Sequence, residues 1–396
     1  MLPGTALIVD VSSGEVVEAC FISFMSDECG LMQYGSVSLA PVRVSRENEM
    51  KDGSMVEKEN ENMINDSKVQ EYIEKKGTKL TFRPDIKVLD CTIRDGGLVN
   101  DFAFEDDFMK AVYQMCIQAG VDYMEVGYKA SQRIYSPSKH GKWKFTTEED
   151  LRNVIEEKQS CLKLSVMADA ERTDYHEDIL PKSESIIDMI RVATYVNQIP
   201  AAVDMIKDAH DKGYETTINI MAVSTVKDHD IEEALGILAD TEVDVIYLVD
   251  SFGVYYSEEI RELVHKYLQY AQAKGKIVGI HCHNNQQLAY ANTIEALIMG
   301  ASYLDATISG LGRGAGNCPM ELLLGFLKNP KFHVRPVIEF IQNRILPLRE
   351  KMAWGYDIPY MITGQFNQHP RSAIKFLNGE DNKNYLQFYD SFIEEE

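Results

Sequence analysis

From Ile86 to about Lys328 the chain repeats one pattern, an apolar run followed by a longer stretch with helical apolar spacing. Continuous apolar runs are typical of parallel strands that are buried on both faces by helices. Eight such units in about 240 residues predict an α/β fold, the TIM (β/α)8 barrel. The alternative is an open doubly wound sheet, but no GxGxxG turn opens a helix after the first run.

The pattern also predicts where the elements of the barrel begin and end. We expect strands at 87–91, 123–126, 162–167, 187–193, 215–221, 245–249, 277–281 and 303–308. We expect helices at 106–119, 148–158, 201–212, 231–239, 257–273, 287–299 and 319–327. Catalytic residues of such barrels lie at the C-terminal ends of the strands, so those ends are the places to search for chemistry.

The predicted barrel, residues 81–330, is flanked by segments of different character. Residues 1–43 alternate apolar and polar residues in short runs, which favours a small N-terminal extension with about three strands. Residues 44–80 are dense in charge and poor in branched apolar residues, so we interpret them as a linker with a short helix at 67–76. Residues 331–396 form a C-terminal helical tail or lid, for which Tyr356, Tyr360, Asn367 and His369 offer polar groups.

Composition excludes several classes of partner. Lys and Arg number 40 against 62 Asp and Glu, a net charge of -22 that repels phosphate backbones and anionic membrane surfaces. We therefore expect neither a nucleic-acid nor a membrane partner. The 7 cysteines form no close CxxC pair, and no apolar run approaches the length of a membrane span. We expect a cytoplasmic protein and leave open whether it is a homodimer.

Polar residues gather where several of the expected strands end. The first strand runs into DCTIRDGG, the second into MEVGYK, the sixth into YLVDSFG, the seventh into GIHCHNN and the eighth into SGLGRGAGN. His281 and His283 stand two apart on a strand, so both imidazoles point to the same face. A carboxylate from another strand, for which we choose Asp95, would complete a facial set of three metal ligands. An isolated HxH pair is more often structural, but its position at a strand end favours a metal site.

These motifs resemble a known family. LDCTIRDGG is similar to the D-x-T-[LI]-R-D-G signature of the DRE-TIM metallolyases, which include hydroxymethylglutaryl-CoA lyase, 4-hydroxy-2-oxovalerate aldolase and isopropylmalate synthases. HCHNN, a following helix and the turn GLGRGAGN match the second signature of that group. The resemblance extends over about 86–328 and leaves residues 1–80 outside.

The resemblance implies roles for individual residues. Asp95, His281 and His283 would hold a divalent cation, with Asn317 on it or near it. Arg94 would be the catalytic arginine, whose fixed guanidinium stabilises an enolate. Catalytic roles are also implied for two acidic residues, Glu125 and Asp250, for which the alternative is an ion pair or a helix cap at the barrel rim. Asp90 is expected to face the barrel interior and to orient its neighbours and the substrate.

Other positions complete the predicted substrate site. Gly312 and Gly314, in the turn that precedes Pro319, are candidates for receiving a substrate carboxylate on backbone N–H groups, although glycine-rich turns often serve only to turn the chain. The aldolases of the family carry a His where this chain has Leu98, and isopropylmalate synthases carry a Glu where it has Gly97. The proton-transfer group must therefore come from elsewhere, and the candidates are Tyr128, Lys129 and His140.

The resulting hypothesis is a metal-dependent carbon–carbon lyase or aldolase. It would act through an enolate on a small 4-hydroxy-2-oxo acid and give pyruvate and an aldehyde. Mn²⁺ or Mg²⁺ suits a mixed oxygen and imidazole site that exchanges substrate. The alternatives are an acyl-CoA-dependent Claisen-type acyltransferase and a barrel without catalytic activity.

Overall fold

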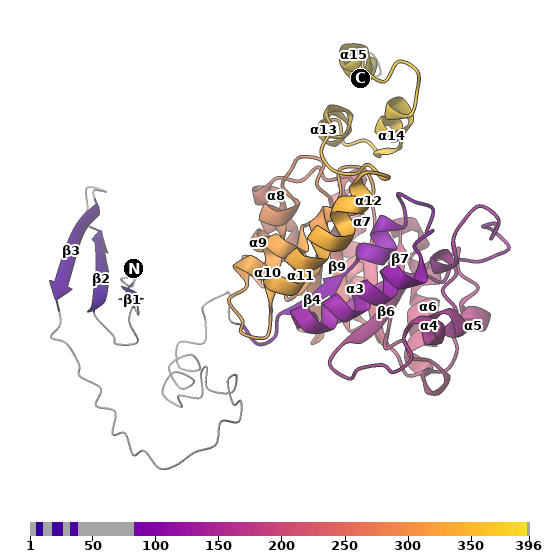
Figure 1. The fold of residues 1–396 in the computed structure, drawn as a ribbon, viewed down its shortest axis with the longest axis horizontal. Coiled ribbons are helices and arrows are strands. Elements are labelled where there is room, and N and C mark those ends of the chain that lie inside the picture. Colours follow the sequence, from indigo (N-terminus) through magenta and orange to yellow (C-terminus); the bar gives the residue numbers. More distant parts are fainter. Residues whose placement is uncertain (1–4, 11–17, 27–31, 39–82, 394–396) are drawn as a thin grey trace. The chain divides into compact units, whose positions relative to one another are not determined.

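The computed structural model describes residues 5–10, 18–26, 32–38 and 83–393, which fall into two units, 1–70 and 71–396. In the first unit β1 (Thr5–Asp10), β2 (Glu18–Ser26) and β3 (Met32–Ser38) form an antiparallel sheet with β2 in the middle (Figure 1). These strands lie where the alternating pattern of residues 1–43 predicts strands. The proposed linker and its short helix lie outside the described residues.

The second unit contains eight parallel strands that close into a barrel in the order β10-β11-β4-β5-β6-β7-β8-β9. This closure confirms the predicted TIM barrel, and the open doubly wound alternative is wrong. The strands are β4 (Lys87–Asp90), β5 (Tyr123–Tyr128), β6 (Lys163–Asp169), β7 (Met189–Thr194), β8 (Glu215–Ile220), β9 (Val245–Asp250), β10 (Ile277–Cys282) and β11 (Tyr303–Ala306).

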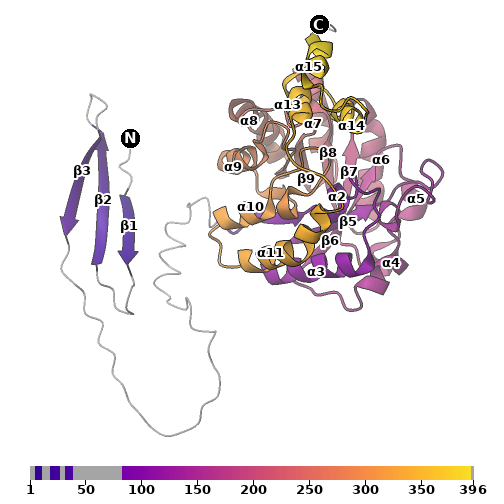
Figure 2. The ribbon, with the colours of Figure 1, turned by 45° about the horizontal axis from the view of Figure 1, so that its top comes forward.

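Helices cover the outside of the barrel and connect its strands (Figures 1 and 2). Those of the barrel are α2 (Thr92–Gly96), α3 (Asp106–Ala119), α4 (Glu148–Val154), α5 (Tyr175–Asp178), α6 (Ile199–Asp211), α7 (Asp228–Ala239), α8 (Ser257–Ala273), α9 (Ala289–Met299) and α10 (Met320–Phe326). The C-terminal segment adds α11 (Val334–Phe340), α12 (Leu346–Arg349), α13 (Ile358–Gln365), α14 (Arg371–Leu377) and α15 (Tyr385–Ile393). Among these described helices, none combines the length and the apolar character that crossing a bilayer requires.

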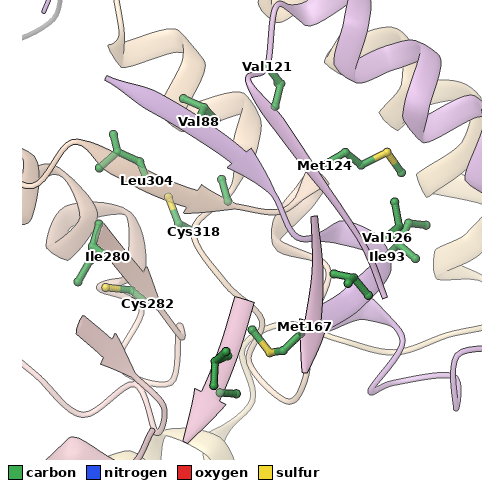
Figure 3. Close-up of a cluster of buried hydrophobic side chains, with 14 of the residues drawn as sticks. Val88, Ile93, Val121, Met124, Val126, Met167, Ile280, Cys282, Leu304 and Cys318 are labelled. Atoms are coloured by element: carbon green, nitrogen blue, oxygen red, sulfur yellow. The ribbon is translucent and has the colours of Figure 1, made fainter. Parts of the chain in front are cut away.

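Alternation along each strand separates two layers of side chains. Val88, Met124 and Ile280 belong to the large apolar cluster between the strands and the helices (Figure 3). The residues next to them in each strand point into the barrel, where Leu89 contributes to a small apolar cluster near the start of the strands. Above it the interior becomes polar, and this polar layer forms the base of the candidate site.

The C-terminal helices α13, α14 and α15 gather at one end of the barrel (Figure 2). The loop after β10 holds α13, because Asn285 Nδ2 donates to Tyr360 O at 3.2 Å and Gln286 Nε2 donates to Met361 O at 3.0 Å. Asn367 Nδ2 donates to Ser224 O, beyond β8, at 2.7 Å. The segment after α12 is therefore bonded to loops at the C-terminal ends of the strands, where the candidate site lies.

Candidate metal and substrate site

Three buried side chains converge at the C-terminal mouth of the barrel. Asp95 lies in α2 directly after β4, while His281 and His283 lie at the end of β10 and point to the same face. One ligand atom from each lies within 4.8 Å of the others. His281 Nε2 is 3.3 Å and His283 Nε2 is 3.9 Å from Asp95 Oδ2. The structure thus brings together the three predicted ligands.

Asn317 joins this group through the backbone, since it forms a β-bridge with His283. Its side-chain Oδ1 and His281 Nε2 are both buried, and neither has a hydrogen-bond partner among the described residues. Buried polar atoms are rarely left without partners, so a missing ligand is the natural explanation. A carboxylate, two imidazoles and an amide oxygen suit a divalent cation.

A continuous chain of ion pairs supports the ligands from inside the barrel. Arg94 donates from Nη1 to Asp95 Oδ2 at 2.6 Å and from Nε to Glu125 Oε2 at 2.7 Å. Arg191 continues the chain, with Nη1 3.1 Å from Glu125 Oε2 and Nη2 2.5 Å from Asp305 Oδ2. These buried charges therefore alternate in sign from α2 across β5 and β7 to β11.

The ion pairs determine which groups are charged. Burial alone would raise the pKa of Asp95, but Arg94 and the two histidines hold it well below its usual range. Burial likewise opposes ionisation of Asp305, but Arg191 and His281 lower its pKa to about 2. Burial lowers the pKa of His283 well below its usual value, which favours the neutral imidazole that binds metals. The site therefore presents ionised carboxylates and a neutral His283.

Arg191 and Asp305 are site residues that the sequence analysis did not identify. Arg191 is completely buried in β7 and Asp305 is buried in β11. The available signal was the period of the strands, because a single charge stands at an inward-facing position in each of the segments MIRVAT and YLDA. Their partners are distant in sequence, so the pairing itself was not readable.

A cavity of about 70 Å³ opens beside the three ligands at the barrel mouth. A wider groove between α6 and α7 adjoins it, since Tyr195 and Ala222 line both. The cavity is lined by Arg94, Leu98, Tyr128, Met167, Ala193, Tyr195, Asn219, Met221, Ala222, Val249, Ser251, Phe252, His281, His283, Arg313 and His369.

Two predicted acidic site residues point away from the barrel interior. Asp90 follows the inward-facing Leu89 in β4 and so points to the outer layer, where Thr92 Oγ1 donates to Asp90 Oδ1 at 2.6 Å. The expectation that Asp90 faces the interior is therefore wrong. Asp250 follows the inward-facing Val249 in β9, and its Oδ1 accepts from Val254 N at 3.0 Å. Each carboxylate stabilises the turn that follows its strand and lies apart from Arg94, unlike Glu125.

The three candidates for proton transfer lie in different places. Tyr128 lines the cavity, and burial raises its pKa far above the usual value. Lys129 lies instead beside Glu148 and Asp178 in a different depression. His140 Nδ1 is 3.6 Å from Asp101 Oδ1 and is not among the residues that line the cavity.

The glycine-rich turn packs against the ligands. A Cβ on Gly312 would lie 2.2 Å from Asn317 Nδ2 and 2.9 Å from Asp95 Oδ1, so only glycine fits there. Gly314 has a positive φ of 62° and faces the Tyr360 ring. The backbone N–H of Arg313 donates to Asp95 Oδ1 at 3.1 Å, so this group holds the ligand and is not available to a substrate carboxylate.

The predicted C-terminal donors differ in their positions. His369 lines the cavity. Tyr360 contacts the glycine-rich turn, Asn367 bonds to the loop after β8, and Tyr356 is exposed. Of this segment, His369 is therefore the donor that reaches the candidate substrate space.

The chain is similar to a family model and to several curated proteins. A family model described as HMGL-like matches residues 85–342. An oxaloacetate decarboxylase of Mycobacterium tuberculosis is 31% identical over 247 residues, which cover 61% of this chain and 69% of that protein. A 4-hydroxy-2-oxovalerate aldolase of Thermus thermophilus is 30% identical over 292 residues, which cover 70% of this chain and 81% of the relative.

Solved structures show the same fold. The N-terminal domain of a candidate aldolase from Bacteroides vulgatus superposes with a TM-score of 0.65 at 29% identity, over 75% of this chain and 98% of that domain. Hydroxymethylglutaryl-CoA lyase from Pseudomonas aeruginosa superposes with a TM-score of 0.54 over 66% of this chain and 93% of that protein. Its identity of 16% supports the fold alone.

Proposed function

The chain belongs to the HMGL-like family and is a carbon–carbon lyase, and we propose that it cleaves a 4-hydroxy-2-oxo acid to pyruvate and an aldehyde with Mn²⁺ or Mg²⁺ bound. The family match and the aldolase and decarboxylase names of the relatives support this proposal. A cytoplasmic location and a homodimer stay predictions from the sequence.

The observation that carries the proposal is the hydrogen bonding of the Arg94 guanidinium. Its Nε and Nη1 are bonded to Glu125 and Asp95, and its Nη2 has no hydrogen-bond partner within the described part of the chain. Because Arg94 lines the cavity beside His281, this third nitrogen is available to a substrate oxygen. Two carboxylates thus fix the guanidinium, so it needs no reorganisation when negative charge develops.

Cleavage of the bond between C3 and C4 leaves its electron pair on the pyruvate half as an enolate. A cation held by Asp95, His281, His283 and Asn317 would supply Lewis-acid stabilisation of the 2-oxo oxygen. Arg94 would donate from Nη2 to the oxygen that gains charge. Glu125 would keep the guanidinium in place, and the apolar walls contributed by Met167 and Val249 would limit water near the enolate.

The acyltransferase alternative is less well supported. Relatives about 30% identical to this chain carry the names 4-hydroxy-2-oxovalerate aldolase and oxaloacetate decarboxylase, and these names favour the lyase reaction. Measuring CoA release against pyruvate release separates the two reactions.

The test is a panel of 4-hydroxy-2-oxo acids incubated with purified protein and Mn²⁺ or Mg²⁺, with pyruvate measured by a coupled reaction. We expect pyruvate release that stops after chelation and returns with the metal. Oxaloacetate is included to measure decarboxylation. Absence of pyruvate from every acid, with the cation bound, would refute the proposed reaction.

A further inference from the structure

Arg313 differs from Arg94, the other arginine that lines the cavity, because it has no acidic partner among the described residues. Arg94 contacts two carboxylates, whereas within the described ranges no carboxylate oxygen lies within 4.0 Å of the Arg313 guanidinium. Its Nη2 donates to Ser251 O at 2.9 Å, and its buried Nε has no partner in the same described part. A partly desolvated cation without a counter-charge is costly, so an anionic ligand would stabilise it.

His369 adds a second donor at the same end of the cavity. Its Nδ1 accepts from the backbone N–H of Arg371 at 3.1 Å, so in the neutral ring Nε2 carries the proton. The ring lies 5.2 Å from that of Phe252, the residue after Ser251, to which Arg313 is bonded. Burial and the charges of Arg313 and Arg371 lower the pKa of His369 to about 4, so the ring is neutral at neutral pH.

We propose that Arg313 and His369 bind a second carboxylate, carried by the aldehyde half of the substrate. The substrate class is then a 4-hydroxy-2-oxo dicarboxylate, and the aldehyde product is a small oxo acid such as glyoxylate. This inference rests on the proposed function and specifies its substrate.

The position of the two ends of Arg313 supports this assignment. Its backbone N–H bonds to the ligand Asp95, while its guanidinium reaches Ser251 at the end of β9. The side chain thus spans the cavity mouth from Asp95, after β4, to the end of β9, the strand beside the ligand-bearing β10. A substrate held at the metal by its 2-oxo acid end would present its far end to the guanidinium and to His369.

The positive charge of Arg313 favours aldol cleavage over loss of CO₂ from the substrate. A guanidinium bound to a departing carboxylate stabilises charge that disappears as CO₂ forms, which favours the ground state over the transition state. In aldol cleavage the C3–C4 bond breaks, the 4-hydroxyl loses its proton to form the aldehyde, and the enolate gains one proton at C3. The second carboxylate keeps its charge throughout, so its contacts with Arg313 persist.

A matched pair of substrates tests the proposal. 4-Hydroxy-2-oxopentanoate and 4-hydroxy-2-oxoglutarate differ by a methyl group or a carboxylate at the same carbon. We expect kcat/KM of the wild type to favour the dicarboxylate by about tenfold or more, the range of a charge-assisted pair. Arg313→Gln should abolish most of this preference, because glutamine keeps the backbone bond to Asp95 and loses the charge.

The control is Arg349→Gln, which makes the same charge change on the exposed Arg349 that bonds Ser309 outside the cavity. It should leave the ratio of the two kcat/KM values unchanged. His369→Phe should lower the ratio as well, mainly through KM for the dicarboxylate. Equal kcat/KM for both acids, or an equal loss on both in Arg313→Gln, would overturn the proposal and leave the lyase reaction intact.

Binding gives a readout that does not need turnover. Calorimetric titration with 2-oxoglutarate and 2-oxopentanoate should show about tenfold tighter binding of the dicarboxylate by the wild type but not by Arg313→Gln. If neither hydroxy acid yields pyruvate while this binding preference holds, the reaction is wrong and the anion subsite stands. If the preference is absent, the subsite is wrong whatever the activity.

Discussion

Asp305 Oδ2 lies 2.9 Å from His281 Nδ1 and is also bonded to Arg191. In this bond His281 Nδ1–H would donate to Asp305 Oδ2, so that His281 Nε2 would be free to bind the predicted cation. A buried carboxylate behind a ligating histidine also increases the basicity of the ring. We therefore propose that Asp305 orients the predicted ligand His281.

Asp305→Asn should lower metal affinity about 10–100-fold, because the neutral amide no longer favours the ligating tautomer of His281. Calorimetric titration of the metal-free protein with Mn²⁺ measures this. Asp244→Asn is a matched control, since Asp244 bonds the backbone of Thr216 before β9 begins, away from the ligands. Unchanged affinity in Asp305→Asn would show that the bond to His281 does not support the site.

His281→Ala and His283→Ala should each remove the bound cation with little loss of fold, because the ligands cap a barrel whose strands are already paired. Elemental analysis of the purified variants measures the metal, and circular dichroism reports the fold. Two variants that both retain a stoichiometric divalent ion would show that the ligand assignment is wrong.

Arg191→Met should lower the free energy of unfolding by about 3–5 kcal/mol, the usual cost of removing one partner from a buried ion pair. The change leaves Glu125 and Asp305 without their shared cation inside the barrel. Urea unfolding followed by fluorescence gives the value. A loss below about 1 kcal/mol would mean that water or protonation compensates for the missing charge.

Stability should depend on the protonation of His369. Its pKa of about 4 in the folded protein lies below the value near 6.5 of an unfolded histidine. Between these values the unfolded chain binds more protons, so stability falls as pH decreases from about 6.5 to about 4. Comparing urea midpoints at pH 7 and pH 5 should show a larger decrease for the wild type than for His369→Asn. An equal decrease of the urea midpoint in the two proteins would show that a group other than His369 causes the pH dependence.

The fold was largely readable from the sequence because strand and helix periods alternate without interruption. Predicted helices 106–119 and 257–273 match α3 and α8 at both ends. The helix predicted at 148–158 ends at Val154, because Ile155 leaves helical geometry with φ -110° and ψ 83°. Such an ending depends on tertiary packing, which apolar spacing does not report.

The site was readable only in part. The HxH pair and Asp95 follow from position at strand ends, and the structure brings them together. The orientations of Asp90 and Asp250 depend on the phase of alternation, which an apolar run buried on both faces leaves ambiguous. The pairing of Arg191 with Asp305 spans the barrel interior, so only the closed sheet reveals it.

Arg94 and the cation are proposed to stabilise the enolate of pyruvate. Arg94→Lys keeps a positive charge but loses the planar fork that bonds Asp95 and Glu125 and leaves Nη2 for substrate. Metal binding should persist. The rate of enolate formation should fall about a hundredfold or more, comparable to the loss of one oxyanion donor.

Exchange of the methyl protons of pyruvate in D₂O measures enolate formation directly, without knowledge of the aldehyde. We predict that the Mg²⁺-loaded wild type exchanges these protons far faster than buffer with Mg²⁺ alone, as followed by proton NMR, and that Arg94→Lys exchanges them about a hundredfold more slowly. Two results would contradict the proposed role of Arg94 and the cation. One is exchange by the wild type at the rate of the protein-free control, and the other is exchange by Arg94→Lys at the wild-type rate.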